Sequence, residues 1–361
     1  MVNIVHITHT DIKNDWRIRK QLICLNTNSD FEVFGLGIDS FKHLNFPQDG
    51  IKSDNVSCID TNNKLGKIFT TLLASLKILI RLFSVPKIDI LHCHDTPALL
   101  IGAVFSVFRS KTKIIYDAHE LESMKGGQTK LFSAITSLIE NICFKRISGF
   151  ITVSPAILDW YKNKFKFTNA VTILNIPNYS NQEAVESLRE KYDIHPAKNI
   201  FTHIGLLNKG RGIEEMLEAF KNNKKNHLIL FGFGDLEDKI IKYTRENKNI
   251  HYFGNVENSK LHSYLIQCDF GLCTLENESL SDYFSLPNKF FEYMNAELTI
   301  IGSPLKEISR VIEETQTGYV TDNLKSFLDK ANYQKIQYNS PYEYTWEHQV
   351  NKLLKFYQSF F

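Results

Sequence analysis

Several features that define large classes of protein are missing from this sequence of 361 residues. Its six cysteines form no CxxC pair and follow no regular spacing, so we expect reduced thiols and neither a disulfide framework nor a zinc site. No run reaches 18 uninterrupted apolar residues, which predicts that no helix spans a membrane. The net charge of +2 gives no general attraction to nucleic acid, and the first residues show no signal-peptide layout. Together these absences favour a cytoplasmic protein without a nucleic-acid partner.

The composition and the apolar pattern indicate a globular protein with two domains. Hydrophobic residues make up 43% and charged residues 23% of a chain that is too long for one ordinary core. Apolar strands alternate with helices from residue 2, and a second alternation follows the polar stretch 176–196. We therefore predict an α/β fold with two Rossmann-like, doubly wound domains, and a cleft between them as the natural ligand site. The expected parts are residues 1–178, residues 179–339, and a terminal helix over 340–361 that Ser340 caps and that packs back on the first domain.

Residues 64–83 are predicted to form one long helix with a wide apolar side and four basic residues. One interpretation is a helix buried against a sheet, with its basic side chains reaching water from the edges. The other is a basic amphipathic surface that contacts anionic lipid. The width of the apolar side favours burial, because helices packed between a sheet and other helices commonly have such a side.

Polar residues follow two apolar strands in the first half of the chain. His92, His94 and Asp95 end one run, and His119 ends the next. Open parallel sheets bind ligands at the carboxyl ends of their strands, so these side chains are candidate site residues. The histidines also suggest a metal site, but no complete ligand set is fixed by the sequence, and we favour no metal. The structural alternative for His119 is a histidine satisfied by Asp117 or by backbone.

The stretch 285–294 predicts a helix start with the groups that a nucleotide needs. Pro287 suits the first turn of a helix, and the spacing of Asn288, Lys289 and Glu292 places them on one face. A phosphate can bind the N–H groups of the helix start and Lys289, while a sugar hydroxyl can bind Glu292 about one turn further on. A nucleoside diphosphate has both parts. The structural alternative is a surface ion pair between Lys289 and Glu292.

Six short motifs run in order through both halves of the chain. They are N-D-W-R-I-R-K at 14–20, D-I-L-H-C-H-D at 89–95, Y-D-A-H-E at 116–120, I-T-V-S at 151–154, a glycine followed by R-G-I-E over 205–214, and L-P-N-K-F-F-E-Y-M at 286–294. Their order resembles that of the retaining, nucleotide-sugar-dependent glycosyltransferases of the GT-B fold, the group 1 type of the large bacterial family that builds polysaccharides and glycolipids. The resemblance implies the GT-B fold, in which an acceptor-side domain faces a donor domain across a cleft.

The resemblance also implies roles for individual residues. Glu292 would hold the ribose of the donor, and Lys289 with Lys209 or Arg211 would neutralise its diphosphate. His119 would face the transferring sugar and the acceptor. The other expected donor-binding residues are Asp15, Arg17, Gly232, Gly234, Leu286, Pro287 and Asn288, and the expected acceptor-side residues are His94 and Asp95.

The implied reaction moves a hexose or related sugar to a saccharide or lipid-linked acceptor without a metal or a cofactor. The enzyme would work in the cytoplasm or peripherally at the inner face of the plasma membrane, in contact with anionic lipid. Three positions depart from the usual family pattern, namely Leu206, Phe284 and Glu297. The alternatives are a nucleotide-sugar epimerase of the same fold and a degenerate, nucleotide-sugar-binding partner subunit without catalytic activity.

Overall fold

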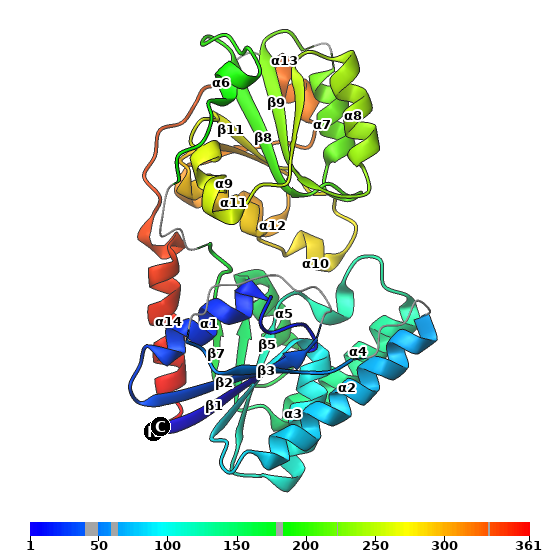
Figure 1. Cartoon of the computed structure of the whole chain (residues 1–361), viewed down its shortest axis with the longest axis vertical. Helices are drawn as coiled ribbons and strands as arrows, with labels where there is room; N and C mark the ends of the chain where they lie inside the picture. The colour runs from blue at the N-terminus through cyan, green and yellow to red at the C-terminus, as the bar shows by residue number, and fades with distance from the viewer. Residues whose placement is uncertain (40–49, 59–63, 178–182, 222, 331–332) are drawn as a thin grey trace. The chain divides into compact units, whose positions relative to one another are not determined.

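The computed structural model describes residues 1–39, 50–58, 64–177, 183–221, 223–330 and 333–361, which form two compact units (Figure 1). Unit 1 contains Met1–Leu174 and Gln349–Phe361, and unit 2 contains Asn175–His348. The predicted boundary between residues 178 and 179 lies outside the described residues. Each unit has a parallel sheet with helices, so the predicted α/β class is confirmed.

The described strands of unit 1 form one parallel sheet in the order β3-β2-β1-β4-β5-β6-β7. They are β1 (Val2–Ile7), β2 (Phe31–Ile38), β3 (Ser53–Val56), β4 (Ile90–His94), β5 (Lys113–Ala118), β6 (Gly149–Thr152) and β7 (Ala170–Thr172). Its main helices are α1 (Trp16–Asn26), α2 (Lys64–Ser84), α3 (Asp95–Phe108), α4 (Lys130–Cys143), α5 (Pro155–Lys164) and, from Gln349 on, α14 (Trp346–Gln358). The strand order reverses between β1 and β4, and ligands bind at the carboxyl ends of strands at such a point.

Unit 2 repeats this plan in the order β10-β9-β8-β11-β12-β13. Its strands are β8 (Asn199–Leu206), β9 (Asn226–Phe233), β10 (Ile250–Gly254), β11 (Phe270–Cys273), β12 (Thr299–Gly302) and β13 (Gly318–Val320). Its helices are α6 (Leu188–Lys191), α7 (Ile213–Phe220), α8 (Glu237–Glu246), α9 (Asn258–Leu265), α10 (Leu280–Tyr283), α11 (Asn288–Asn295), α12 (Lys306–Thr315) and α13 (Leu324–Asp329). The order reverses between β8 and β11, where Phe201 and Phe270 stack with their ring centroids 4.4 Å apart.

The terminal helix α14 begins later than predicted and has a different cap. Residues Tyr342–Tyr344 form a 3-10 turn, and α14 starts at Trp346. The hydroxyl of Ser340 donates to the carbonyl of Met294 at 2.6 Å, so the prediction that it caps the helix is wrong. Thr345 fills that place, because its hydroxyl accepts from the backbone N–H of His348 at 3.3 Å.

The predicted helix over residues 64–83 is confirmed as α2, but its expected burial is only partly correct. Ala74, Ile78 and Leu82 face inward and are buried. Most of the other large apolar side chains whose placement is described are exposed, at Phe69, Leu72, Leu76, Ile80 and Phe83. One stripe along the helix is sufficient to cover the sheet, and the second stripe remains at the surface. No helix among the described residues combines the length and the apolar character that crossing a bilayer requires.

Candidate functional site

The carboxyl ends of β1, β4 and β5 bring polar side chains to one face of the unit 1 sheet. His6 lies opposite His92 in the β1–β4 register, and His94 lies opposite Asp117 in the β4–β5 register. Alternate residues of a strand share a face, so His92 and His94 point the same way. All four residues are at most 1% exposed. The sheet therefore holds a carboxylate among imidazoles in its interior.

Asp117 is the centre of this cluster. Its Oδ2 accepts from Nε2 of Gln21 at 3.0 Å and lies 3.2 Å from Nε2 of His92. The same oxygen is 3.4 Å from Nδ1 of His94 and 3.6 Å from Nε2 of His119. Burial alone would raise the pKa of Asp117, but its histidine partners, His119 first, hold the pKa well below its usual range. A permanent negative charge therefore orients the imidazoles around it.

His119 is poised to carry a proton. Burial alone would lower its pKa, but the carboxylates of Asp95 and Asp117 outweigh burial and raise the pKa above the ordinary value, against the nearby positive charge of Arg17. Its Nδ1 lies 3.5 Å from Oδ2 of Asp95, and its backbone N–H donates to Oδ1 of Asp95 at 3.2 Å. The ring nitrogens of His94 and His119 are 3.1 Å apart. The structure thus brings together four predicted site residues, namely His92, His94, Asp95 and His119.

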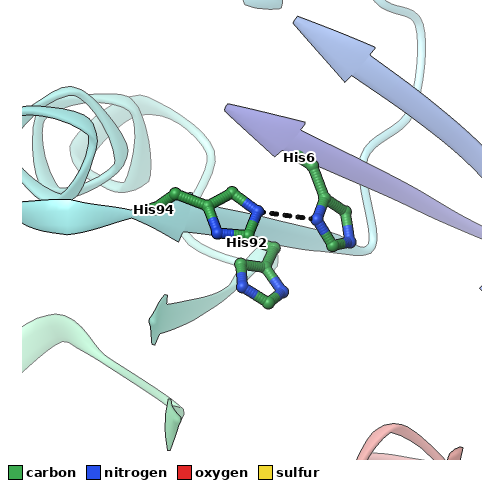
Figure 2. A group of neighbouring side chains, drawn as sticks. All are labelled: His6, His92 and His94. Atoms are coloured by element: carbon green, nitrogen blue, oxygen red, sulfur yellow. Dashed lines mark hydrogen bonds between the residues drawn. The ribbon is translucent and has the colours of Figure 1, made fainter. Parts of the chain in front are cut away.

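Figure 2 shows the inner histidines of this edge, His6, His92 and His94, as a close group. Nδ1 of His6 is 2.9 Å from Nε2 of His94, and the rings of His6 and His92 stack at 4.1 Å with an interplanar angle of 22°. Burial lowers the pKa of all three, that of His92 to about 4, so they are neutral at neutral pH. A metal lies in the plane of each ring that binds it, and stacked rings aim their nitrogens along nearly parallel lines. These three residues therefore make a poor metal site.

A second set, His94, Asp117 and His119, has spacings closer to those of a metal site. Their ligand atoms are 3.1–3.6 Å apart, and ligands about 2.0–2.1 Å from a tetrahedral zinc are separated by roughly 3.3 Å. The contacts of Oδ2 of Asp117 with Gln21 and His92, however, make hydrogen bonding sufficient to account for the cluster. That no metal binds here stays a prediction.

Several residues of this edge were missed by sequence reasoning. The amine of Lys125 lies 2.9 Å from the carboxylate of Glu122, and both border Asp95. The hydroxyl of Tyr357 is 3.1 Å from Nε2 of His6 and also hydrogen-bonds Nδ1 of His92. Tyr357 comes from α14 at the far end of the chain, and no local pattern marks it.

In unit 2, α11 begins near the carboxyl edge of the sheet. Pro287 is its N-cap residue, in extended conformation, and among the described residues no side chain caps the helix. The hydroxyl of Tyr293 accepts from the N–H of Ile204 at 3.1 Å and donates to the carbonyl of Leu272 at 3.3 Å, which fixes α11 on β8 and β11. The buried residues of this helix are Phe290, Phe291, Tyr293 and Met294, so Asn288, Lys289 and Glu292, which were predicted to share one face, all lie outside its buried side.

Lys289 lies near a second cation, Arg211. Burial, together with nearby Arg211, lowers its pKa to about 8, although Cys273 acts in the other direction. Its amine is 3.5 Å from Nε2 of His203, whose own pKa burial and Lys289 hold well below the usual value. Lys289 forms no ion pair with Glu292 among the described contacts, so the surface-pair alternative is not supported. This amine would gain from an anion.

The structure separates the two alternatives for the second cation. Arg211 is half-buried and acts electrostatically on Lys289 and His203. Lys209 is exposed and acts on Glu214, which also pairs with Lys239. Arg211 is therefore the better partner for Lys289.

The glycines of this edge serve different purposes. A Cβ on Gly232, at φ +132°, would meet the carbonyl oxygen of Gly205 at 1.8 Å, and one on Gly234 would meet Oδ1 of Asn208 at 2.3 Å. The Cβ of Gly234 would also meet the backbone carbonyl of Leu207 at 2.7 Å, so both glycines are explained by the close approach of neighbouring backbone, which their predicted nucleotide role did not anticipate. Gly205, at φ +106°, faces open space, and Leu206 beside it is 47% exposed at the end of β8.

The remaining predicted residues differ in their exposure to solvent. Glu292 is half-buried one turn into α11 and Asn288 is exposed at its start, whereas Leu286 is buried as a core residue. The carboxylate of Asp15 caps α1 by accepting from the N–H of Ile18 at 3.3 Å, and it also accepts from a threonine hydroxyl. These contacts account for Asp15 without a ligand.

Two family models match the chain. The model described as Glycosyltransferase Family 4 matches residues 46–177, and the model described as Glycosyl transferases group 1 matches residues 198–333. No curated protein matches the chain.

Solved structures resemble the chain over nearly its whole length. Sucrose-phosphate synthase from Thermosynechococcus elongatus has a TM-score of 0.75 at 14% identity, with 99% of each chain covered. HepE from Anabaena, solved in complex with UDP-glucose, has a TM-score of 0.67 at 14% identity, covering 100% of this chain and 98% of that one. A putative UDP-N-acetylglucosamine 2-epimerase from Listeria monocytogenes has a TM-score of 0.66 at 10% identity, covering 99% and 96%. The predicted GT-B fold, with two Rossmann-like sheets, is confirmed.

Proposed function

Since both matched halves belong to glycosyltransferase families, this chain is a glycosyltransferase, and we propose that it transfers a sugar from a nucleoside-diphosphate sugar with retention of configuration. The observation that carries the proposal is the start of α11. A helix N-terminus that no side chain caps among the described residues, the half-buried Lys289 and the nearby Arg211 would offer positive charge to a diphosphate. Glu292 is half-buried one turn further on and would hold the ribose of the donor.

The arrangement favours departure of the diphosphate. As the bond to the sugar breaks, negative charge develops on the leaving oxygen, and fixed cations and N–H groups stabilise that charge more in the transition state than in the ground state. Retention then needs no carboxylate nucleophile, because the departing phosphate oxygen can take the acceptor proton on the same face of the sugar. In unit 1, His119 would contact the transferring sugar and the acceptor, with Asp95 and Asp117 holding its ring.

The donor site would work without a metal or a cofactor, because Lys289, Arg211 and the helix N-terminus supply the charge that a divalent cation supplies elsewhere. We expect enzyme treated with a chelator to retain its transfer rate. A rate that falls with the chelator and returns only with a divalent cation would contradict metal independence and leave the sugar transfer itself standing.

The proposed acceptor is a saccharide or a lipid-linked saccharide, and the proposed setting is the synthesis of bacterial surface polysaccharide or glycolipid. The transferred sugar would be a hexose or a related sugar. A lipid-linked acceptor would place the reaction at the inner face of the plasma membrane, with the enzyme in peripheral contact with anionic lipid.

The test compares Glu292→Ala with Glu313→Ala, a change of an exposed glutamate on α12. Purified protein is screened for stabilisation by nucleotide sugars, and transfer of labelled sugar to saccharide and lipid-linked acceptors is then followed. Glu292→Ala should unfold at the normal temperature and lose turnover, and Glu313→Ala should behave as wild type. The anomeric configuration of the product, read by nuclear magnetic resonance, decides retention. Unchanged transfer by Glu292→Ala would reject the role of this residue.

A second candidate is an epimerase acting on a nucleotide sugar. The likeness to the epimerase structure from Listeria monocytogenes favours this alternative. The two activities differ in their need for an acceptor. An epimerase would change the sugar of the donor with no acceptor present, whereas a transferase would leave the donor intact until an acceptor is added. Binding of a nucleotide sugar with turnover of neither kind would favour the third alternative, a degenerate partner subunit.

A further inference from the structure

Three neighbouring helices of unit 1 present large apolar side chains to the surface. On α2, the exposed residues Phe69, Leu72, Leu76, Ile80 and Phe83 recur at intervals of three and four. On α3 they are Leu100, Val104, Val107 and Phe108, and on α4 they are Leu131, Phe132, Ile135, Leu138 and Ile142. These three sets are called the apolar face below. They include more than half of the exposed large hydrophobic side chains of the described chain.

The helices that carry the apolar face lie next to one another in unit 1. α3 packs against both α2 and α4 (Figure 1). Phe83 joins the C-terminal ends of α2 and α3, with its ring centroid 5.1 Å from that of Phe105 and 5.8 Å from that of Phe108. The surface of a soluble monomer rarely shows so many contiguous large apolar side chains, and patches of this kind mark sites of protein or membrane contact.

The fold accounts for the inward sides of α2 and α4 but not for their outward apolar stripes. In α2 the inward stripe is Ala74, Ile78 and Leu82, and in α4 the inward positions are Thr136, Glu140 and Cys143. The inward side of α4 is thus more polar than its outward side. Core packing cannot explain an outward stripe of leucine, isoleucine and phenylalanine, so a contact outside the fold must account for it.

The charges of the three helices are mostly of one sign. Over residues 64–84, 95–112 and 130–146 the sequence has nine basic residues and two acidic residues, although the whole chain is nearly balanced, with 42 basic and 40 acidic residues. Of the two acids, Glu140 is fully buried and accepts a hydrogen bond from the hydroxyl of Tyr116 at 3.1 Å, and Asp95 accepts from the backbone N–H of His119 at 3.2 Å. Exposed basic residues stand at the helix ends, namely Arg81, Arg109, Lys111, Lys130, Lys145 and Arg146.

We infer that the apolar face is a docking surface for an anionic lipid bilayer, in which the apolar side chains enter the boundary of the acyl chains and the basic residues at the helix ends contact lipid headgroups. Exposed apolar stripes bordered by lysine and arginine are the chemistry of helices that lie in a membrane interface. A second copy of this chain is a poorer occupant, because a symmetric contact would set these like charges against one another. The inference does not rest on sugar transfer, and it specifies the surface that makes the proposed peripheral contact.

The experiment measures sedimentation of the full chain with vesicles of phosphatidylcholine, with and without about 30% phosphatidylglycerol. Wild type should sediment with the anionic vesicles and much less with the neutral ones. Leu76→Glu on α2 and Leu138→Glu on α4 should each weaken the partition at least tenfold, because a charge replaces an exposed leucine that would enter the acyl boundary of the bilayer. Arg109→Glu with Lys145→Glu should weaken binding to anionic vesicles and bring it toward the neutral level.

Ile266→Glu and Lys325→Glu are the matched controls. Ile266 is 49% exposed and Lys325 is exposed, and both lie in unit 2, so neither change should alter sedimentation. All variants change exposed side chains, and unfolding temperatures near that of wild type would verify that they fold. If the wild type transfers sugar to a water-soluble acceptor, every variant should do so at the same rate. This result would show that the apolar face and the donor site act independently.

Three results would overturn the inference. The first is wild type that fails to bind anionic vesicles. The second is binding that Leu76→Glu and Leu138→Glu leave unchanged. The third is a dimer, seen by light scattering in the absence of lipid, that Leu76→Glu dissociates, because the apolar face would then be an interface between copies of this chain.

Discussion

The two sheet edges that carry the site residues differ in the partners that surround their charged side chains. At the unit 1 edge, the carboxylate of Asp117 is surrounded by three histidine rings and an amide, and His119 lies between two carboxylates. At the unit 2 edge, Lys289 has a neutral histidine and another cation as neighbours. At the first edge the charged side chains already have partners of opposite charge or hydrogen-bond partners. At the second edge the positive charge of Lys289 would be balanced by a bound anion. This difference is why we place the diphosphate at α11 and the acceptor at the histidines.

Removal of Asp117 should have the largest effect on stability. Asp117→Ala removes a counter-charge of the buried His119 and a hydrogen-bond partner of the neutral His92 and His94, and breaking a buried ion pair from one side costs about 3–5 kcal/mol. Urea unfolding of unit 1, followed by a probe in that unit, should show the loss. Asp159→Ala, at an exposed position of α5, is the control and should lose little. An Asp117→Ala protein as stable as wild type would mean that the edge is not held together by this charge.

Removal of Lys289 should have the largest effect on the reaction. Lys289→Ala takes away a buried cation that stabilises the leaving diphosphate, and the loss of one such group lowers kcat by roughly a hundredfold or more. Its unfolding free energy should not fall, because the lowered pKa of Lys289 indicates an amine whose charge is costly without an anion. Lys325→Ala serves as the control. If Lys289→Ala lost as much stability as Asp117→Ala, the two edges would not differ in how their charges are balanced, and the comparison would be contradicted.

Nucleotide binding should depend on pH through the same lysine. The pKa of Lys289 is lowered to about 8 in the free protein, and a bound diphosphate favours the charged amine and so raises that pKa. Binding then takes up a proton above pH 8, and affinity should fall by up to about tenfold per pH unit as pH rises beyond that value. Calorimetric titrations from about pH 7 to about pH 9.5 would measure the slope. Lys289→Arg keeps its charge throughout and should flatten the profile.

The smallest predicted effect is the pH dependence of stability due to His119. Its pKa is raised by Asp95 and Asp117 despite burial and despite Arg17, so the folded protein holds this proton more tightly than the unfolded chain does. The stabilisation is fully present below the unfolded pKa of about 6.5 and is lost as pH rises through the folded value. His119→Gln should reduce this slope in thermal unfolding between about pH 6 and pH 8. An unchanged slope would mean that another group titrates there.

Residues with local patterns were predictable from the sequence. The apolar runs specified most strands, and the three- and four-residue spacing in 286–294 placed Asn288, Lys289 and Glu292 on one face, which agrees with their exposed or half-buried positions beside the buried Phe290 and Met294. The polar residues after β4 and β5 were expected to gather because carboxyl ends of parallel strands share an edge, and the network of His94, Asp95 and His119 confirms that expectation.

Residues whose placement depends on distant contacts were not predictable. Tyr357 reaches His6 across almost the whole chain, and no periodicity in α14 distinguishes it from other core positions. Ser340 fits a local capping pattern, but its hydroxyl instead bonds Met294, and Thr345 takes the cap. Likewise, hydrophobicity alone cannot tell which stripe of α2 covers the sheet and which faces outward, because both stripes are apolar.

The central claim is that a nucleoside-diphosphate sugar binds at the start of α11, and calorimetric titration of single-residue variants tests it most directly. The titration compares a nucleoside diphosphate with the matching nucleoside, on wild type, Lys289→Ala and Glu292→Ala. We predict that Lys289→Ala weakens binding of the diphosphate and leaves binding of the nucleoside unchanged, whereas Glu292→Ala weakens both. Diphosphate affinities that are equal in all three proteins would place the donor elsewhere and contradict the account.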